Sequence, residues 1–561
     1  MSYGAMRAIV GAVLLSGVVA PGVRAMQDTT RVSIGSNGVQ GDGDSLRSSM
    51  TPDARFVGFS SLADDLVAGD TNSKEDVFVV DRASGLIERV SVDSFGNQAQ
   101  DGGAVACPGI SADGRWVAFV SDSSDLVPVD TNGASDVFIR DRATGTTSRV
   151  SVDSAGAEAD SGSFNPTLTG SGQFVVFNSD ANNLVTGDAN QQRDVFLRDL
   201  VAGTTERVSV DSSGFEGNGS SRLGAASADG RYVVFSSAAS NLVAGDTNGR
   251  DDVFVRDRVL GTTERVSVDS SGVEGDSSSS VASLSDDGRF VAFQSSARNL
   301  VAGDTNAAID IFLRDRTLGT TTRVSVDSNG VEGNYDSLSP VLSPDGARVG
   351  FSSQSTNLTD VDRNKSLDAF VHDVASGATE CVSVVASGDT ADQLSVFRGF
   401  SAGGRSTVFD SRADDLDASD TNGACDVFVR EPCAAPATWV NYGSGVAGTN
   451  GIPALTARRF PALGATVDVD LANSYGQPSL GLLVVGLQRG SFKTKFGADL
   501  LVTPGLLVPI SFSYSGDVFT GAIPDDVAFC GATVDLQGIE FDPGAQFGVS
   551  FSQGLELVIG N

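Results

Sequence analysis

Histidine, cysteine and basic residues are scarce in this chain, and each scarcity argues against certain classes of protein. The 561 residues include one histidine, five cysteines and only 38 Lys and Arg against 71 Asp and Glu, a formal net charge of −33. Five cysteines in a chain of this length are too few for a disulfide scaffold. So acidic a chain repels phosphate backbones, which argues against nucleic acid and favours cations or basic surfaces as partners.

Long apolar runs are also lacking, except near the N-terminus. Arg7 precedes the apolar stretch 8–20, and Val23 and Ala25 are small residues at the positions that a signal peptidase reads. We therefore predict a signal peptide over residues 1–25, cleaved before Met26, and an exported protein that is periplasmic, cell-surface or secreted. No later segment is long and apolar enough to span a bilayer.

Glycine is abundant, at 66 residues, and the chain repeats itself seven times. Three markers recur in phase with steps of 58 to 60 residues: a Ser-x-Asp-Gly-like turn, an Asp-x-Asn-x-x-x-Asp loop and an Arg-Val-Ser-Val-like strand. The turns begin at Thr51, Ser111, Thr169, Ser227, Ser285, Ser343 and Ser401. The strand motifs begin at Arg31, Arg89, Arg149, Arg207, Arg265, Arg323 and Cys381. Such a period indicates a repeat architecture.

Each repeat contains four short β-rich runs separated by Gly and Asp turns, which is typical of propeller blades. The chain enters with a strand motif at Arg31–Ile34 that has no partner, and the last repeat ends after Asp426–Val429 without one. We therefore predict an all-β fold, a seven-bladed β-propeller over residues 27–432, in which the N-terminal strand completes the last blade and removes an open sheet edge.

The repeats resemble TolB-type, WD-like propeller repeats. The mark of that family is Ser-Pro-Asp-Gly followed by an apolar strand ending in Phe, and Ser343–Gly346 with Phe351 matches it fully. Other copies match with substitutions, and those at Thr169 and Ser401 lack the Asp. The resemblance implies interaction or scaffolding roles and no single activity.

The period stops after Arg430. Residues 433–451 indicate a linker, and the Val- and Leu-rich runs of residues 452–561 predict a small C-terminal β-sandwich. Tyr442–Gly445 and Phe529–Gly531 resemble a terminal domain of large exported bacterial proteins, which often carries Cys where Val446 stands. Cys433 and Cys530 flank this region, and a disulfide between them is one alternative. Cys107, Cys381 and Cys425 replace other residues of sibling repeats and are interpreted as incidental.

The Asp-x-Asn-x-x-x-Asp loops are the best chemical candidates. Their oxygen atoms could converge on Ca²⁺, which takes six to eight oxygen ligands. The alternative is an Asx turn, in which the side chains accept backbone N–H groups. The candidate calcium ligands are Asp70, Asn72, Asp76, Asp130, Asn132, Asp136, Asp188, Asn190, Asp194, Asp246, Asn248, Asp252, Asp304, Asn306, Asp310, Asp362, Asn364, Asp368, Asp420, Asn422 and Asp426.

No catalytic residue is predicted. His372 stands where five sibling repeats carry Arg, which favours a strand residue over a general base. Gly399–Gly403 matches the Gly-x-Ser-x-Gly nucleophile pattern, but its Ser401 falls on the turn shared by every repeat, with no helix after it. No repeat stands out by an insertion or an extra acid cluster, and such symmetry favours a protein that is not an enzyme.

We therefore expect an exported, non-enzymatic binding or scaffold module with calcium as its one candidate cofactor and a protein or polysaccharide of the cell envelope or exterior as partner. A carbohydrate-active hydrolase or lyase on the propeller is one alternative, and a purely structural cell-surface protein is another. Because strands alternate in direction, two loop sets should share one acidic face. The second set carries Asp93, Asp153, Asp211, Asp269, Asp327, Glu158, Glu216, Glu274 and Glu332.

Overall fold

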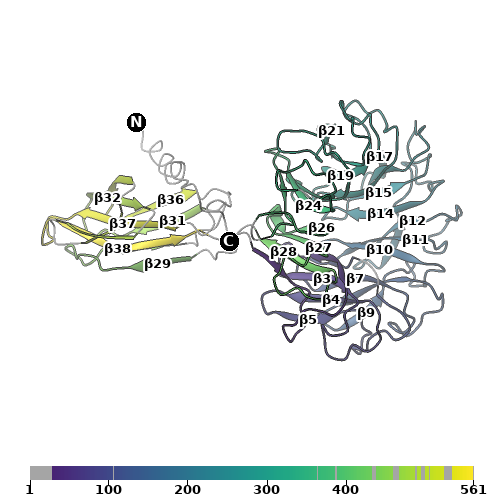
Figure 1. Ribbon diagram of the computed structural model, residues 1–561, viewed down its shortest axis with the longest axis horizontal. Coiled ribbons are helices and arrows are strands. Elements are labelled where there is room, and N and C mark those ends of the chain that lie inside the picture. The colour runs from purple at the N-terminus through teal and green to yellow at the C-terminus, as the bar shows by residue number, and fades with distance from the viewer. Residues whose placement is uncertain are drawn as a thin grey trace. The chain divides into compact units, whose positions relative to one another are not determined.

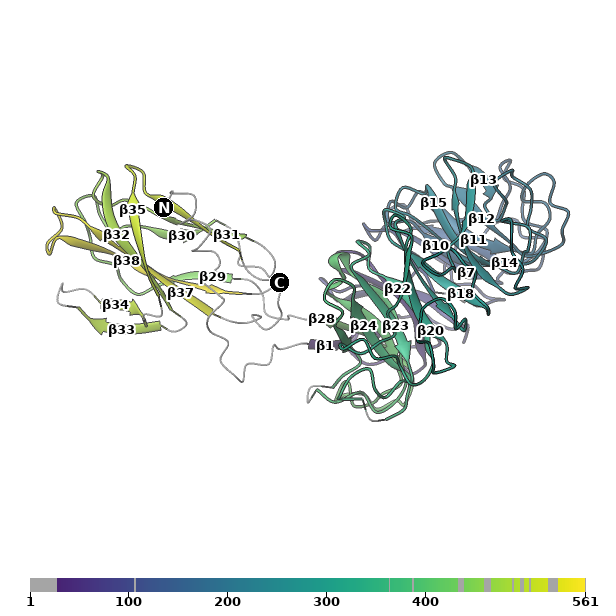
Figure 2. The same cartoon turned by 90° about the horizontal axis from the view of Figure 1, so that it is seen from above.

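The computed structural model describes residues 28–104, 107–362, 364–385, 388–431, 438–458, 466–486, 489–494, 499–503, 506–522 and 533–559. The chain divides into two compact units, one over Thr29–Arg430 and one formed by the chain from Glu431 onward (Figures 1 and 2). The predicted signal peptide, Cys433 and Cys530 lie outside the described residues. Among those described, no helix is long and apolar enough to cross a membrane.

The first unit consists of seven four-stranded antiparallel sheets, here called blades one to seven. The predicted seven-bladed propeller is thereby confirmed. Blades one to three contain β2 (Ser45–Met50), β3 (Phe56–Ser61), β4 (Asp76–Asp81), β5 (Leu86–Arg89); β6 (Gly109–Ile110), β7 (Trp116–Ser121), β8 (Asp136–Asp141), β9 (Thr146–Arg149); β10 (Ser163–Leu168), β11 (Phe174–Ser179), β12 (Asp194–Asp199) and β13 (Thr204–Arg207). Blades four to six contain β14 (Ser221–Ala226), β15 (Tyr232–Ser237), β16 (Asp252–Asp257), β17 (Thr262–Arg265); β18 (Ser279–Leu284), β19 (Phe290–Ser295), β20 (Asp310–Asp315), β21 (Thr320–Arg323); β22 (Ser337–Leu342), β23 (Arg348–Ser353), β24 (Asp368–Asp373) and β25 (Thr379–Cys381).

Blade seven is built from both ends of the propeller. Its strands β26 (Ser395–Phe400), β27 (Thr407–Ser411) and β28 (Asp426–Glu431) are completed by β1 (Asp28–Arg31), with the short 3-10 turn η1 (Ala402–Gly404) between the first two. The Val32 N–H donates to the Val427 carbonyl at 2.8 Å. The predicted closure by the N-terminal strand is therefore confirmed.

The closing strand ends three residues before the predicted limit of Ile34. The reason is the serine of the Arg-Val-Ser-Val motif: the Val427 N–H donates to the Ser33 hydroxyl at 3.1 Å, and that hydroxyl donates to Asp426 at 2.5 Å. A side chain thus takes the place of a ladder hydrogen bond. The serines of the other blades do the same, as Ser267 does for Val253.

A pair of phenylalanines fills the centre of each blade. One comes from the second strand and its cross-strand partner from the third, as with Phe235 and Phe254 of blade four, whose ring centroids lie 5.8 Å apart. Alternation along these strands points both rings into the hydrophobic space between blades. The other pairs are Phe59–Phe78, Phe119–Phe138, Phe177–Phe196, Phe293–Phe312, Phe351–Phe370 and Phe409–Phe428.

The second unit has two main sheets around one core, which confirms the predicted β-sandwich. The predicted linker over residues 433–451 is wrong in part, because it contains β29 (Thr438–Tyr442), which pairs with β38 of the larger sheet. One sheet has the order β29-β38-β37-β32-β35 and the other β30-β31-β36, with β33 and β34 as a separate pair. Leu471 of the smaller sheet and Leu483 and Leu555 of the larger belong to the same buried cluster. The strands are β29 (Thr438–Tyr442), β30 (Leu455–Ala457), β31 (Thr466–Leu471), β32 (Ser479–Gly486), β33 (Arg489–Lys493), β34 (Asp499–Val502), β35 (Leu506–Phe512), β36 (Asp517–Ala522), β37 (Thr533–Phe541) and β38 (Val549–Val558).

Candidate cation site in the Asp-Asn loops

The Asp-x-Asn-x-x-x-Asp loop connects the second and third strands of each blade, and its asparagine forms an Asx turn. In blade four the Asn248 Oδ1 accepts the Arg250 N–H at 2.7 Å. The Asn248 amide donates to Asp252 Oδ2 at 3.1 Å and to the Gly275 carbonyl at 2.9 Å. The asparagine therefore folds the loop and holds the last aspartate in place.

A guanidinium group lies between the two aspartates of this loop. Arg265 Nη1 is 3.8 Å from Asp246 Oδ1, 3.2 Å from Asp252 Oδ2 and 2.6 Å from Glu274 Oε2. This arginine begins the Arg-Val-Ser-Val motif of the same blade. In six blades such an arginine is ion-paired with both aspartates of its loop: Arg31, Arg89, Arg149, Arg207, Arg265 and Arg323.

The last aspartate of each loop is buried among these groups. Asp136 and Asp252 are fully buried, and Asp252 Oδ1 accepts the Ser267 hydroxyl at 2.6 Å. Burial raises the pKa of Asp136 to about 6, although Ser151 and Arg149 act in the opposite direction. The arginine therefore offsets only part of the desolvation of a buried carboxylate.

Three loops bring three carboxylates together. The carboxylate oxygens of Asp130, Asp136 and Glu158 lie within 4.8 Å of one another, as do those of Asp188, Asp194 and Glu216 and those of Asp246, Asp252 and Glu274. Such groups could hold a metal ion, and their oxygen ligands suit a hard cation. In each cluster the positive charge present is the guanidinium just described.

The two loop sets expected on one face do meet there. The Thr131 N–H of the Asp-Asn loop donates at 2.9 Å to Glu158 of the loop that leads to the next blade. Thr305 and Glu332 are bonded likewise in blade five. The glutamates therefore cover the arginine sites from the side of the neighbouring loop.

Blade six departs from this arrangement. Cys381 stands in the arginine position and Thr390 in the glutamate position. Asp368 Oδ1 accepts the Ser383 hydroxyl at 2.8 Å, but Oδ2 of Asp362 and Oδ2 of Asp368 are buried without a hydrogen-bond partner. Within the part of the chain that the structure describes, neither aspartate has an ion pair. The two carboxylates that bind a guanidinium in the other blades thus have none among the described residues.

Electrostatics in blade six reflect the missing cation. Asp362 is 4% exposed and Asp368 is fully buried. Burial raises the pKa of Asp368 to about 7, and the neighbouring Asp362 raises it further, while Ser383 lowers it. The thiol of Cys381 lies 3.5 Å from the Ser383 hydroxyl, and burial raises its pKa too. Cys381 thus stands in the position of the arginine that pairs with this loop in the other six blades, which the interpretation of Cys381 as incidental does not take into account.

The lone histidine and the Gly-x-Ser-x-Gly serine lie in structural positions. His372 is part of β24, where its Nδ1 and the Thr379 hydroxyl are 2.9 Å apart, and burial lowers its pKa. Ser401 is buried, and its hydroxyl accepts the Ser406 N–H at 2.9 Å. The turn of blade four has the same bond, from the Tyr232 N–H to Ser227.

Sequence reasoning recognised the arginine of each repeat as a strand marker and missed its role as the internal cation. The available signal was the interval of 13 residues from the last aspartate of a loop to its arginine in blades one to five, as from Asp252 to Arg265. The same alignment shows Cys381 as the exception.

No protein-family model and no curated protein matches the chain. Solved structures similar to it include a putative TolB from Agrobacterium tumefaciens, with 15% identity over 49% of this chain and 78% of that chain and a TM-score of 0.31. The WD40 repeats of RRP9 share 11% identity over 72% of this chain and 97% of that one, with a TM-score of 0.36. A periplasmic gluconolactonase from Pseudomonas aeruginosa shares 14% over 80% and 95%, with a TM-score of 0.30. These likenesses concern the fold alone.

Proposed function

We propose that the protein is an exported, non-enzymatic binding or scaffold module whose acidic loop face takes up one calcium ion, at blade six. Its signal-like N-terminus supports export, and the near-identity of its loops supports a role in binding over catalysis. The observation that carries the calcium proposal is the pair of buried carboxylates, Asp362 and Asp368, which lacks the arginine found in the other six blades.

The other six loops are weaker calcium candidates by the same argument. Calcium there has to displace an arginine already held at 3.0 to 3.8 Å from its two aspartates. Breaking a buried ion pair leaves an uncompensated charge and costs about 3–5 kcal/mol. At blade six no such pair exists among the described residues, and carboxylate oxygens with water molecules can complete the shell of Ca²⁺.

The test is calorimetric titration of Ca²⁺ into the purified full chain after treatment with chelator. We expect one site, a higher melting temperature in the presence of Ca²⁺ by mass action, and loss of both effects in Cys381→Arg. Asp310→Asn in blade five is the matched control and should leave calcium binding unchanged. A chain that binds no calcium, or a Cys381→Arg variant that binds it equally well, contradicts the proposed site.

The binding role itself is tested by capture. The immobilised chain should retain a specific protein or polysaccharide from the envelope of the exporting cell. A saccharide that is cleaved instead of retained favours the alternative of a carbohydrate-active hydrolase or lyase.

A further inference from the structure

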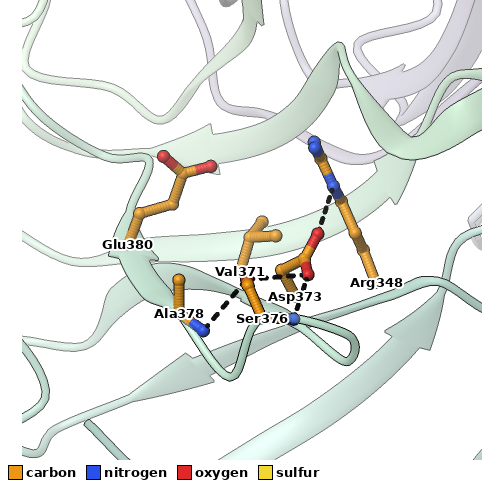
Figure 3. A pocket seen from close by; sticks show the side chains of 6 residues that line it. All are labelled: Arg348, Val371, Asp373, Ser376, Ala378 and Glu380. Atoms are coloured by element: carbon orange, nitrogen blue, oxygen red, sulfur yellow. Dashed lines mark hydrogen bonds and ion pairs between the residues drawn. The ribbon is translucent and has the colours of Figure 1, made fainter. Parts of the chain in front are cut away.

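A pocket of about 210 Å³ opens on the side of blade six that packs against blade seven (Figure 3). Val371 of its wall belongs to the same buried cluster as Phe397 and Phe428 of blade seven. The pocket is lined by Arg348, Val371, Asp373, Ser376, Ala378 and Glu380. Glu380 stands at one side, and Arg348 and Asp373 are paired at the other (Figure 3).

In three other junctions between blades an arginine of the following blade fills this place and pairs with a glutamate of the preceding blade. Arg316 of blade five donates to Glu264 of blade four at 2.7 Å and also to the Gly288 carbonyl. Its guanidinium carbon lies 4.4 Å from the centroid of the Tyr232 ring. Arg142 and Arg258 bind Glu88 and Glu206, carbonyl oxygens and aromatic rings in the same way.

Glutamate and arginine are kept or lost together at the other junctions from blade one to blade six, whereas at the junction of blade seven with blade one Arg82 is kept and the glutamate position holds Thr30. Where the arginine position holds Leu200 or Val374, the glutamate position of the preceding blade holds Ser148 or Thr322. Those junctions are apolar, with Leu200 and Val374 packed against buried clusters. A glutamate is thus retained only where a guanidinium meets it, and the junction after blade six breaks that rule.

At this junction the arginine position holds Pro432, which lies outside the described residues, and the aromatic position holds Arg348. Arg348 Nη1 donates to the Gly404 carbonyl at 2.9 Å, and its Nε lies 3.5 Å from Asp373 Oδ2. Arg348 therefore takes over the carbonyl that the missing arginine would bind. Glu380 has no hydrogen bond or ion pair with any residue of the described chain.

Glu380 is exposed to solvent at the pocket. Burial by the pocket walls raises its pKa, although Arg348 and Arg430 act in the opposite direction. A carboxylate without a donor among the described residues can accept charge-assisted hydrogen bonds from a cationic group.

We infer that this pocket binds an arginine side chain of a partner polypeptide, whose guanidinium pairs with Glu380 as Arg316 pairs with Glu264. The net charge of −33 favours a basic partner as well. The inference rests on the proposed binding function and names the chemistry of its partner, at a site separate from Asp362 and Asp368.

The probe is N-acetyl-arginine amide, titrated into the full chain at physiological salt, with N-acetyl-citrulline amide as its neutral isostere. We expect weak, saturable binding of the arginine amide, no binding of the citrulline amide, and about tenfold weaker binding or none in Glu380→Gln. Glu264→Gln is the matched control, because its pocket already holds Arg316, and it should bind the arginine amide as the wild type does.

Equal binding of the two amides, or undiminished binding by a folded Glu380→Gln variant, overturns the inference. The melting temperature of each variant checks that it is folded. If the arginine amide does not bind while the chain still captures an envelope partner, this inference fails and the proposed binding function stands. If neither binds, both fail.

Discussion

Arg31 Nη1 lies 3.2 Å from Asp426 Oδ2, although 395 residues separate them in the sequence. Within blade four, Arg265 and Asp252 form the same ion pair at the same distance. The contact of Arg31 with Asp426 is thus the equivalent ion pair, formed between the two ends of the propeller. The strand that closes the ring is therefore held by the same chemistry as a strand of continuous chain.

Arg31→Ala should lower the free energy of unfolding by about 3 kcal/mol, because it leaves a buried carboxylate without its partner. Arg265→Ala should lower it by a similar amount, and chemical denaturation measures both. If Arg31→Ala left the free energy of unfolding unchanged while Arg265→Ala lowered it, β1 would not be docked in solution.

Cys381→Arg should stabilise the protein at neutral pH in the absence of calcium. The introduced guanidinium should bind Asp362 and Asp368 as Arg323 binds Asp304 and Asp310, and hydrogen bonds to charged groups contribute about 1.5–3 kcal/mol. Thermal melting measures the gain. Cys381→Ser serves as the control, since it removes the thiol without adding charge, and a Cys381→Arg variant no more stable than it would count against the ion-pair argument.

Asp368→Asn should change how stability depends on pH. The folded-state pKa of Asp368 is raised to about 7, whereas an aspartate in an unfolded chain titrates near pH ~3.9. The protonated carboxyl therefore stabilises the fold below about pH 4, and this contribution is lost as the pH rises through about 7. One pKa unit corresponds to about 1.4 kcal/mol, so the effect is a few kcal/mol at most.

The Asn variant does not titrate, so with rising pH the wild type should lose stability relative to it. Denaturation of both proteins from pH 4 to pH 8, with chelator present, measures the difference. A difference that stays constant over this range, or that changes in favour of the wild type, contradicts the assigned pKa.

Ser401→Ala and His372→Arg should leave any hydrolase activity of the chain unchanged. The Ser401 hydroxyl fixes a turn, and loss of that hydrogen bond should lower stability by about 1 kcal/mol. Arginine at position 372 restores the residue of five sibling blades. Assays on ester and glycoside substrates, with melting curves alongside, check this; an activity removed by Ser401→Ala at unchanged melting temperature would make that serine catalytic.

The propeller could be predicted because the same turn, loop and strand motifs recur in the same order in every repeat. The Ser-x-Asp-Gly turns and Asp-Asn loops set the blade number, and the solitary motif at Arg31 set the closure. The ion pairs were harder to predict, because Arg265 and Asp246 belong to different strands and loops whose approach depends on blade twist. Junction contacts such as Arg316 with Glu264 join separate blades, so no local pattern reveals them.

The expectation that no repeat stands out by an insertion or an extra acid cluster does not register lost ion-pair partners, for the same reason. Blade six has no insertion, but Arg348, Cys381 and Pro432 replace residues whose roles appear only in three dimensions. Aligning the repeats column by column identifies these substitutions. Only the ion pairs observed in the other blades show that Cys381 and Pro432 replace arginines, so that Asp368 and Glu380 have no ion pair among the described residues.

Because β1 pairs with β28, blade seven can form only after nearly the whole propeller has been synthesised. The ribosome synthesises β1 first and its partner last, so the first strand waits unpaired until nearly the whole propeller has emerged. Contacts so distant in sequence form slowly, and unpaired strand edges invite aggregation in the meantime. A chain interrupted anywhere before Asp426 carries two open edges that nothing in it can cover. Completion of the seventh blade thus distinguishes a finished molecule from a truncated one, since only the truncated one exposes these strand edges.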